Sequence, residues 1–162
     1  MTHQKKHVFK KSVIIMMVTL LWALGFSLPG GYGQDLDVNN QRGFLRDMIA
    51  FKIFIRKAPN DVKSFGFDVH YDSRILEYTG YERGNMTKEF DFFDCVQGEP
   101  GEIRCGGFNK DAGVLSIGQR GEVVVLYFKK IDCRNTSLCL EGLVDDMENW
   151  TTGEGQFICL GR

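Results

Sequence analysis

The chain has 162 residues, and its 20 Lys and Arg nearly balance its 21 Asp and Glu, for a formal net charge of −1. The first 33 residues hold four of the basic side chains and none of the acidic ones, so residues 34–162 carry 16 basic against 21 acidic side chains, a net charge of −5. A mildly acidic domain lacks the basic patch by which proteins bind nucleic acid and the polybasic segment by which they bind anionic lipid. We therefore expect neither nucleic acid nor membrane among its partners.

Residues 1–33 have the composition of a secretory signal peptide. Four lysines between positions 5 and 11 precede an uncharged, mostly apolar run from Ser12 to Phe26, and the small residues Gly31 and Gly33 follow. The apolar run is shorter than the roughly 18 residues expected of a membrane span, and an uncleaved N-terminal anchor is the alternative. We predict a secreted or periplasmic protein in which residues 34–162 form one domain with a single core.

Short apolar segments separated by Gly, Pro, Asn and Asp follow one another along residues 34–162. This pattern predicts roughly nine short strands and an all-β sandwich or barrel. The run from Val123 to Phe128 is too continuous for a strand with a wet face, and it predicts a central strand buried on both sides. One turn of helix fits residues 84–90 and 145–150, and residues 35–46 read as a polar lead into the first strand. The predicted strands cover 49–55, 64–71, 75–78, 90–95, 103–107, 121–131, 138–144 and 156–160.

The segment 64–84, SFGFDVHYDSRILEYTGYERG, alternates most clearly. One parity is apolar and is predicted to face the core of a sandwich, whose sheets lie about 10 Å apart. The other parity is predicted to lie on the outer side of the sheet. Asp72 is expected to end the strand in an Asx-type turn, its carboxylate accepting a nearby backbone N–H. The apolar parity is Phe65, Phe67, Val69 and Tyr71, and the other parity is Ser64, Gly66, Asp68 and His70.

All five cysteines lie after residue 33, and export favours disulfides. Cys95 and Cys105 lie five residues either side of Pro100, so a hairpin turning at GEPGE would place them opposite each other. Cys133 and Cys139 lie three residues either side of Thr136 and are the candidates for a second bridge, which leaves Cys159 over. Other pairings stay open. No pair has the short spacing usual in structural zinc sites, so no metal is predicted.

Catalytic and cofactor motifs are weak or absent in residues 34–162. His70 is the single histidine of this part, and its position among the polar residues of a strand indicates a solvated side chain. The segment 35–46 starts like a calcium loop but has Asn40 and Arg46 where the turn glycine and the bidentate acid belong. The remaining acidic cluster and three glycosylation sequons indicate turns and loops. We predict no enzyme and no cofactor; the cluster is Asp145, Asp146 and Glu148, and the sequons begin at Asn85, Asn135 and Asn149.

The segment 64–84 resembles the third-strand region of cohesin-type domains, in which an alternating aromatic strand runs into a Tyr-Asp turn, a Leu-Glu pair and a loop that ends in Gly. IRCGGF at 103–108 and GEVVVLYF at 121–128 resemble later strands of the same family, so the resemblance spans residues 44–160. It implies a jelly-roll β-sandwich, the fold that cohesins share with bacterial cellulose-binding modules. The matching positions in the first segment are Phe65, Phe67, Val69, Tyr71, Asp72, Leu76, Glu77 and Gly84.

The resemblance implies a non-catalytic module that binds a protein partner, dockerin-like or unknown, in extracellular polysaccharide degradation. In dockerin-binding cohesins the side of the strand held here by Ser64, Gly66, Asp68 and His70 contacts the partner, and Ser64 and Gly66 stand where those cohesins carry Asn and Asp. A carbohydrate-binding module that adsorbs to a polysaccharide is the alternative, because exposed aromatic rings stack on sugars. The candidate rings are Tyr78, Tyr81, Phe93 and Trp150.

Overall fold

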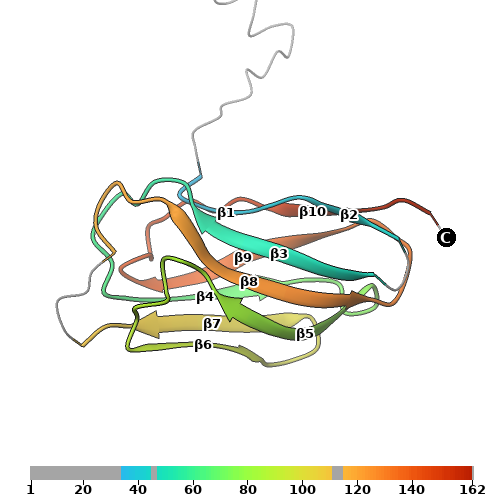
Figure 1. Cartoon of the computed structure of the whole chain (residues 1–162), viewed down its shortest axis with the longest axis horizontal. Helices are drawn as coiled ribbons and strands as arrows, with labels where there is room; N and C mark the ends of the chain where they lie inside the picture. The colour runs from blue at the N-terminus through green and yellow to red at the C-terminus, as the bar shows by residue number, and fades with distance from the viewer. Residues whose placement is uncertain (1–33, 45–46, 111–114, 162) are drawn as a thin grey trace, which may run out of the picture. The chain divides into compact units, whose positions relative to one another are not determined.

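The computed structural model describes residues 34–44, 47–110 and 115–161. The predicted signal peptide, residues 1–33, lies outside the described residues. The described residues form two β-sheets packed as a sandwich, shown in Figure 1, and within these ranges no helix is long and apolar enough to cross a membrane. The ten strands are β1 (Leu36–Val38), β2 (Gln41–Gly43), β3 (Met48–Ile55), β4 (Ser64–His70), β5 (Leu76–Arg83), β6 (Phe92–Gln97), β7 (Glu102–Phe108), β8 (Gly121–Lys130), β9 (Thr136–Asp145) and β10 (Gly155–Cys159).

The smaller sheet has the order β1-β3-β8-β5, and β8 runs between β3 and β5 (Figure 1). Every neighbouring pair in this sheet is antiparallel. Val123, Val124, Val125 and Leu126 are all buried, although successive side chains of a strand point to opposite faces. The prediction of a central strand covered on both sides is therefore confirmed.

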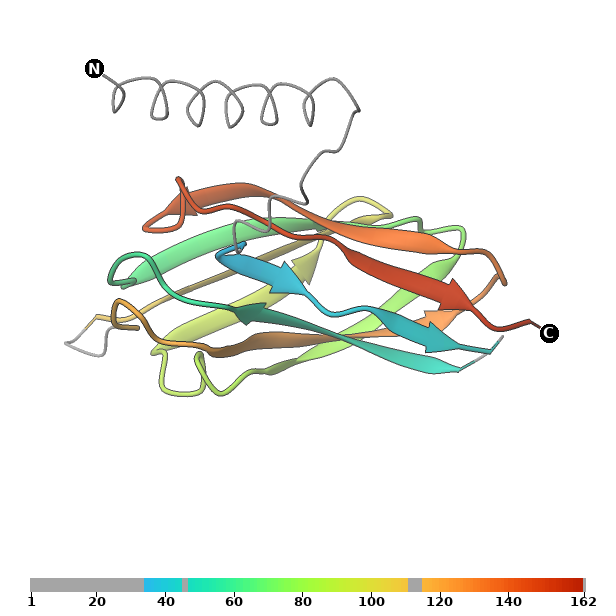
Figure 2. The same ribbon diagram turned by 90° about the horizontal axis from the view of Figure 1, so that it is seen from above.

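The larger sheet has the order β2-β10-β9-β4-β7-β6. β10 pairs in parallel with β2 and antiparallel with β9, and Figure 2 shows the red β10 beside the blue β2. β4 lies between β9 and β7. The segment with the clearest alternation therefore occupies the interior of the larger sheet, where one face of its backbone is covered by the core.

Two strands of the fold were not predicted, and they lie in the segment interpreted as a polar lead. β1 pairs with β3, and β2 pairs with β10, so the segment contributes to both sheets. The polar sequence is accommodated because the buried Asp37 carboxylate pairs with the guanidinium of Arg56. A buried charge is tolerated when it is paired and hydrogen-bonded in this way.

The core fills the space between the sheets with the apolar residues that alternation predicted. Phe65, Phe67 and Val69 of β4 are buried, as is Tyr71 just after the strand. The ring of Phe128 on β8 lies 5.0 Å from the ring of Tyr71, between centroids, in an edge-to-face contact. Such contacts add to the burial of apolar area, and they join the two sheets. The predicted core parity is confirmed.

The turn after Tyr71 has the predicted Asx geometry. One carboxylate oxygen of Asp72 accepts the backbone N–H of Arg74 at 2.9 Å, and both oxygens accept hydrogen bonds from the Arg74 guanidinium at 2.9 and 2.8 Å. These side-chain hydrogen bonds, followed by the backbone one, lower the pKa of Asp72 to about 2. The segments 84–90 and 145–150 form hydrogen-bonded turns without a helix.

We expect the Asp72 turn to make stability depend on pH. The pKa of Asp72 is lower in the folded protein than the value of about 3.9 in an unfolded chain, so its stabilising effect is present above pH 4 and is lost as the pH falls toward 2. The difference in melting temperature between the wild type and Asp72→Asn, measured by circular dichroism, should therefore shrink between pH 5 and 2. A difference that stays constant over this range would contradict the assignment.

Gly84, a position of the sequence resemblance, has no room for a side chain. A Cβ atom at this position would lie 2.1 Å from the backbone oxygen of Glu122, and the Gly84 N–H donates to the Val123 oxygen at 2.9 Å. Because the obstruction is backbone, Gly84→Ala should force β5 and β8 apart and cost about 1–3 kcal/mol, the range for overpacking. Urea unfolding measures this cost. Gly98→Ala is the matched control, because no atom lies within 4 Å of its added Cβ.

The disulfide between Cys95 and Cys105 is present, as the hairpin symmetry predicts. The chain turns at Pro100 and Gly101, and β6 and β7 pair so that Cys95 lies directly opposite Cys105, with 4.1 Å between their Cα atoms. Gly101 has a φ of 98° and supplies the left-handed conformation that the turn requires.

The predicted bridge between Cys133 and Cys139 is wrong. Cys133 is bonded to Cys159, with 5.5 Å between their Cα atoms, and Cys139 is the free cysteine among the described residues. The prediction assumed a loop around Thr136, but β9 begins at Thr136 and runs extended at about 3.3 Å per residue, which carries Cys139 away from Cys133. Pairing of β10 with β9 brings Cys159 back beside the residues that precede β9.

Candidate functional site

The predicted partner-binding residues of β4 lie on the solvent-facing side of the neighbouring strands β9, β4, β7 and β6. We call this side the outer face. Its residues are those of the parity opposite to the core residues on each strand, aligned by the antiparallel registers of neighbouring strands. It comprises Cys139, Glu141 and Val144 of β9; Ser64, Gly66, Asp68 and His70 of β4; Glu102, Arg104, Gly106 and Phe108 of β7; and Phe92, Asp94 and Val96 of β6.

The structure brings the four predicted residues of β4 together along the middle of the outer face. All four are half-buried, in strict alternation with the buried core residues. Gly66 lies opposite Gly106 of β7, so two adjacent positions at the centre carry no side chain. A Cβ on Gly66 would meet the Cγ2 atom of Val144 at 3.0 Å. The centre is therefore flat backbone with a valine at its margin.

The charges of the outer face are mostly acidic. The Arg104 guanidinium makes a two-pronged contact with the Asp68 carboxylate, with Nε–Oδ1 and Nη2–Oδ2 distances of 2.8 and 3.0 Å. It also lies 3.6 Å from a Glu102 oxygen. The Nε2 atom of His70 lies 3.9 Å from a Glu141 oxygen. With one arginine against the carboxylates of β4, β6, β7 and β9, the face favours a partner with complementary positive charge.

Exposed apolar side chains lie on the outer face, and two of them, on β6 and β7, are in contact. The rings of Phe92 and Phe108 stack with centroids 5.3 Å apart, and they remain 47% and 40% exposed. Val96 on β6 and Val144 on β9 are also exposed. None of these four residues was predicted from the sequence as a site residue. Phe92, Val96 and Phe108 could have been predicted, because they alternate with the inward-facing residues of β6 and β7.

The free edge of β6 is blocked by side chains from β5. The Phe93 backbone oxygen accepts hydrogen bonds from the Tyr81 hydroxyl at 3.4 Å and the Arg83 guanidinium at 3.1 Å. The Cys95 N–H donates to the Asp94 carboxylate at 2.8 Å. These contacts occupy groups through which another strand would pair. Recognition by strand addition at β6 is therefore disfavoured.

The four rings proposed for sugar stacking do not form an exposed row, which corrects the premise of the carbohydrate alternative. Phe93 is 2% exposed and Trp150 is 7% exposed, and the indole N–H of Trp150 donates to the Asn60 side chain at 2.7 Å. Tyr78 and Tyr81 are partly buried against the core. Burial is the main cause that raises the pKa of Tyr78 to about 12. The hydroxyls of Tyr78 and Tyr81 on β5 donate to the backbone oxygens of Cys95 and Phe93 on β6, so these two rings close the sandwich between β5 and β6.

The acidic cluster at the end of β9 has a structural role. One carboxylate oxygen of Asp146 accepts the backbone N–H groups of Lys63 and Ser64, at 2.8 and 3.1 Å. Asp145 and Glu148 lie in the same tight turn, and Glu148 N–H donates to the Asp145 backbone oxygen. The predicted Asp-rich turn is confirmed. Within the described ranges no three His, Cys, Asp or Glu side chains are grouped to hold a metal ion.

His70 lies opposite Cys139 in the pairing of β4 with β9, which places the described histidine beside the described free thiol. The Cys139 Sγ atom contacts the Ser137 hydroxyl at 3.9 Å. Burial is the main cause that raises the pKa of the Cys139 thiol. A thiol whose pKa is raised is protonated at neutral pH and is a poor nucleophile, so this arrangement does not resemble an activated cysteine–histidine site.

No family model matches the sequence, and no curated protein matches it. Solved structures do match. A non-cellulosomal cohesin from Archaeoglobus fulgidus matches with a TM-score of 0.63 and 20% identity, over 78% of this chain and 91% of the archaeal one. The OlpA cohesin of Clostridium thermocellum, solved in complex with a dockerin, matches with a TM-score of 0.66 and 14% identity, over 78% and 98%.

The sixth cohesin of scaffoldin B from Acetivibrio cellulolyticus, solved in complex with a Cel5 dockerin, matches with a TM-score of 0.63 and 16% identity, over 78% of this chain and 99% of the cohesin. Each match covers nearly the whole of the known domain. At such low identity the likeness concerns the fold, and it agrees with the sandwich predicted from the strand pattern. The sequence resemblance is confirmed at this level: the chain adopts the cohesin fold.

Proposed function

We propose that residues 34–162 form an exported, non-catalytic module that binds a protein partner through the outer face. The observation that carries the proposal is the composition of this face. Its centre, at Gly66 and Gly106, is flat backbone, while exposed Phe92 and Phe108 and the charged Asp68–Arg104 pair surround it. Flat surfaces with exposed aromatic anchors and a polar surround are typical of protein-recognition sites.

The exposed apolar side chains support a protein partner over a solvated surface. Phe92, Phe108, Val96 and Val144 are all at least 40% exposed and all lie on the outer face. Soluble proteins seldom expose such residues in a group on one face unless they bind something. The acidic character of the same face supports a partner that presents basic side chains.

A dockerin is the first candidate partner, since several of the structurally similar cohesins were solved with dockerins. Gly66 replaces a polar side chain that dockerin-binding cohesins carry, which removes a hydrogen-bonding group from the centre of the face. We therefore propose a dockerin-like protein that packs closely on Gly66 and presents basic side chains to the carboxylates around it. A role in extracellular polysaccharide degradation follows from the same resemblance and is part of the proposal.

Export is supported by the two disulfides, which persist in oxidising compartments outside the cytoplasm. Together with the predicted signal peptide at 1–33, they support a secreted or periplasmic location. The proposal contains no catalytic step and no cofactor.

The test is a binding assay with paired ion-pair variants. Immobilised wild-type domain is probed with the dockerins of the C. thermocellum and A. cellulolyticus complexes and with proteins secreted by the source organism. The variant Asp68→Ala/Arg104→Ala removes the ion pair of the outer face, and Lys52→Ala/Glu122→Ala removes an exposed pair on the smaller sheet. Only the Asp68→Ala/Arg104→Ala variant is expected to weaken binding, by about tenfold, because only this pair lies in the proposed contact surface.

Two results would contradict the proposal. Equal binding by both double variants would show that the outer face is not the contact surface. Adsorption of the wild type to an insoluble polysaccharide, with no capture of any secreted protein or dockerin, would favour the carbohydrate-binding alternative and would require aromatic residues other than Phe93 and Trp150.

A further inference from the structure

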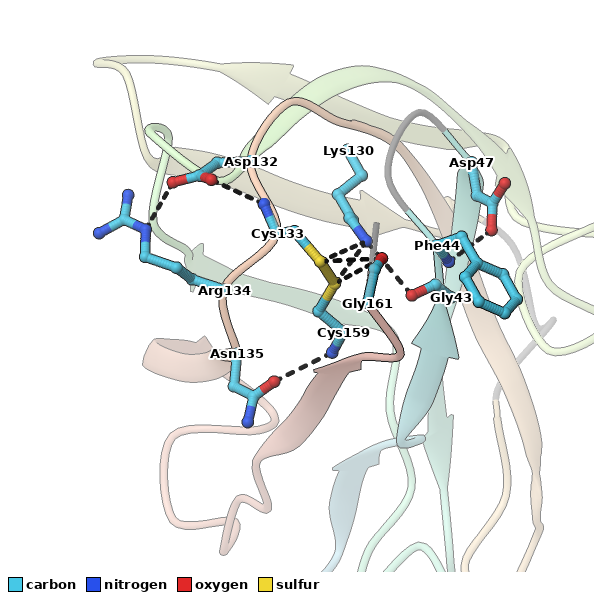
Figure 3. Close-up of a disulfide and its surroundings, with 10 residues drawn as sticks. All are labelled: Gly43, Phe44, Asp47, Lys130, Asp132, Cys133, Arg134, Asn135, Cys159 and Gly161. Atoms are coloured by element: carbon cyan, nitrogen blue, oxygen red, sulfur yellow. Dashed lines mark hydrogen bonds and ion pairs between the residues drawn. A yellow bond between two sulfur atoms is a disulfide. The ribbon is translucent and has the colours of Figure 1, made fainter.

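A fully buried lysine lies against the Cys133–Cys159 disulfide (Figure 3). The Nζ atom of Lys130, at the end of β8, is 3.0 Å from the Sγ atom of Cys159 and 3.7 Å from that of Cys133. It donates a hydrogen bond to the Gly43 backbone oxygen at 3.2 Å and lies 5.0 Å from the centre of the Phe157 ring. Lysine is almost never fully buried unless its charge is paired.

No carboxylate lies within ion-pair distance of this ammonium in the described part of the chain. The two acidic groups that face it, Asp47 and Asp132, favour its charged form from a longer range, but burial is the larger effect and lowers the pKa of Lys130. The Asp47 carboxylate accepts the Phe44 N–H at 2.6 Å, and that of Asp132 accepts the Cys133 N–H at 2.7 Å. The neutral sulfur atoms are thus the closest acceptors besides Gly43.

We propose that Cys133–Cys159 is a readily reducible disulfide in which the Lys130 ammonium stabilises the Cys159 thiolate released on cleavage. A buried ammonium gains little from a neutral disulfide and much from a thiolate at 3 Å. A neighbouring lysine lowers the pKa of a cysteine thiol, and an opposite charge within about 4–6 Å shifts a pKa by roughly 1–3 units. Lys130 therefore stabilises the reduced state relative to the oxidised one.

The reductant is a thiol of the glutathione class, and the geometry sets the direction of cleavage. Its thiolate attacks the Sγ atom of Cys133, the S–S bond breaks, and the electron pair stays on Cys159, whose sulfur is nearer to Nζ. A second thiolate then attacks the sulfur of the glutathione bound to Cys133 and releases oxidised glutathione. The Cys133 thiolate takes a proton from water. In total, the Cys133–Cys159 disulfide and two glutathione thiols are converted to two reduced cysteines and one oxidised glutathione.

The bond joins the segment before β9 to the end of β10. Both cysteines are only partly buried, whereas Cys105 is fully buried and Cys95 nearly so. Among the described residues, no lysine or arginine nitrogen lies within hydrogen-bonding distance of either sulfur of the Cys95–Cys105 pair. Of the two disulfides in the described residues, Cys133–Cys159 is partly accessible and lies against a lysine, whereas Cys95–Cys105 is buried. Reduction at the first frees the end of β10 while the hairpin of β6 and β7 stays closed.

The test measures both disulfides of the oxidised protein in glutathione redox buffers at pH 7.5, with alkylation and mass spectrometry after quenching. In the wild type, Cys133–Cys159 should be reduced at a less reducing glutathione ratio than Cys95–Cys105. Lys130→Met, which keeps the length and removes the charge, should make Cys133–Cys159 about tenfold harder to reduce, equivalent to about 30 mV. The Cys95–Cys105 equilibrium should not change, and it serves as the internal control.

Two readouts need only the wild type and therefore stand even if Lys130→Met folds poorly. Glutathione should be trapped mainly on Cys133, and in the reduced protein Cys159 should alkylate with a pKa at least one unit below the usual thiol value of about 8.5. Glutathione found mainly on Cys159, an ordinary Cys159 pKa, or an unchanged equilibrium in a folded Lys130→Met protein would each overturn the proposal.

Discussion

Replacing Phe67 by Ala is expected to destabilise the domain by about 3–5 kcal/mol. Phe67 is 1% exposed in the interior strand β4, and its ring packs parallel to that of Phe65 with centroids 6.1 Å apart. Truncation would leave a cavity between the sheets that the surrounding strands cannot close. Chemical denaturation of the purified domain measures the loss, and binding to any partner should decline only in proportion to unfolding.

The control for this prediction lies on the same strand. The double variant Asp68→Ala/His70→Ala changes two residues of the outer face, and solvent-facing substitutions usually alter stability by less than about 0.5 kcal/mol. The Asp68–Arg104 ion pair is exposed on the arginine side and is expected to contribute little to stability. If the double variant unfolded as readily as Phe67→Ala, the assignment of core and outer parities would be wrong.

Replacing Gly66 by Arg is expected to weaken partner binding by about a hundredfold, or roughly 2.8 kcal/mol. The added side chain would stand at the flat centre of the outer face, where contact residues usually matter most. Gly66 does not require a positive φ, and the added Cβ meets one atom closely, the Cγ2 atom of Val144 at 3.0 Å. The exposed Val144 side chain must shift by a few tenths of an ångström, so the cost in stability should be small compared with that of Phe67→Ala. Surface plasmon resonance with the captured partner measures the affinity.

Ala50→Arg is the matched control for bulk and charge. Ala50 lies in β3, in register with Tyr127 of β8, on the outward parity of the smaller sheet. Its replacement should leave partner affinity unchanged. Equal losses for the two variants would indicate a general effect on folding, and full affinity of Gly66→Arg would place the contact surface elsewhere.

The sequence predicted those parts of the fold whose stability depends on local alternation. In β4 buried and half-buried residues alternate without exception, because one side of the strand meets the core and the other faces outward. The continuous run in β8 likewise indicated burial on both sides, and the glycine and proline between Cys95 and Cys105 indicated the hairpin. Each of these features depends on residues close together in the chain.

The features that were missed depend on distant partners. Asp37 reads as a surface residue until Arg56 is placed beside it. Cys133 appears close to Cys139 in sequence, yet its partner is brought up by β10 from 26 residues away. The acceptor for a buried Lys130 is likewise supplied by β2 and β10. Alternation carries no information on which strands become neighbours.

In the candidate site, too, residues of one strand were predicted and residues brought together by sheet order were not. The four residues of β4 were found because they share one strand, whereas Phe92, Phe108 and Val144 join the outer face only through the order β9-β4-β7-β6. The aromatic residues Phe93 and Trp150 were named as stacking candidates because composition alone does not show burial. The sheet order replaces the buried Phe93 and Trp150 by the exposed Phe92 and Phe108 as the aromatic candidates for partner contact.

Contact between the outer face and a protein partner is tested most directly by NMR chemical-shift mapping on the isotopically labelled domain. Amide chemical shifts are compared before and after addition of the protein captured from the secreted fraction. We expect the perturbed amides to cluster in β9, β4, β7 and β6, around Gly66, Asp68 and Phe108, with β3 and β8 unchanged. A cluster centred on β3 and β8 of the smaller sheet, around Lys52 and Tyr127, would contradict contact through the outer face.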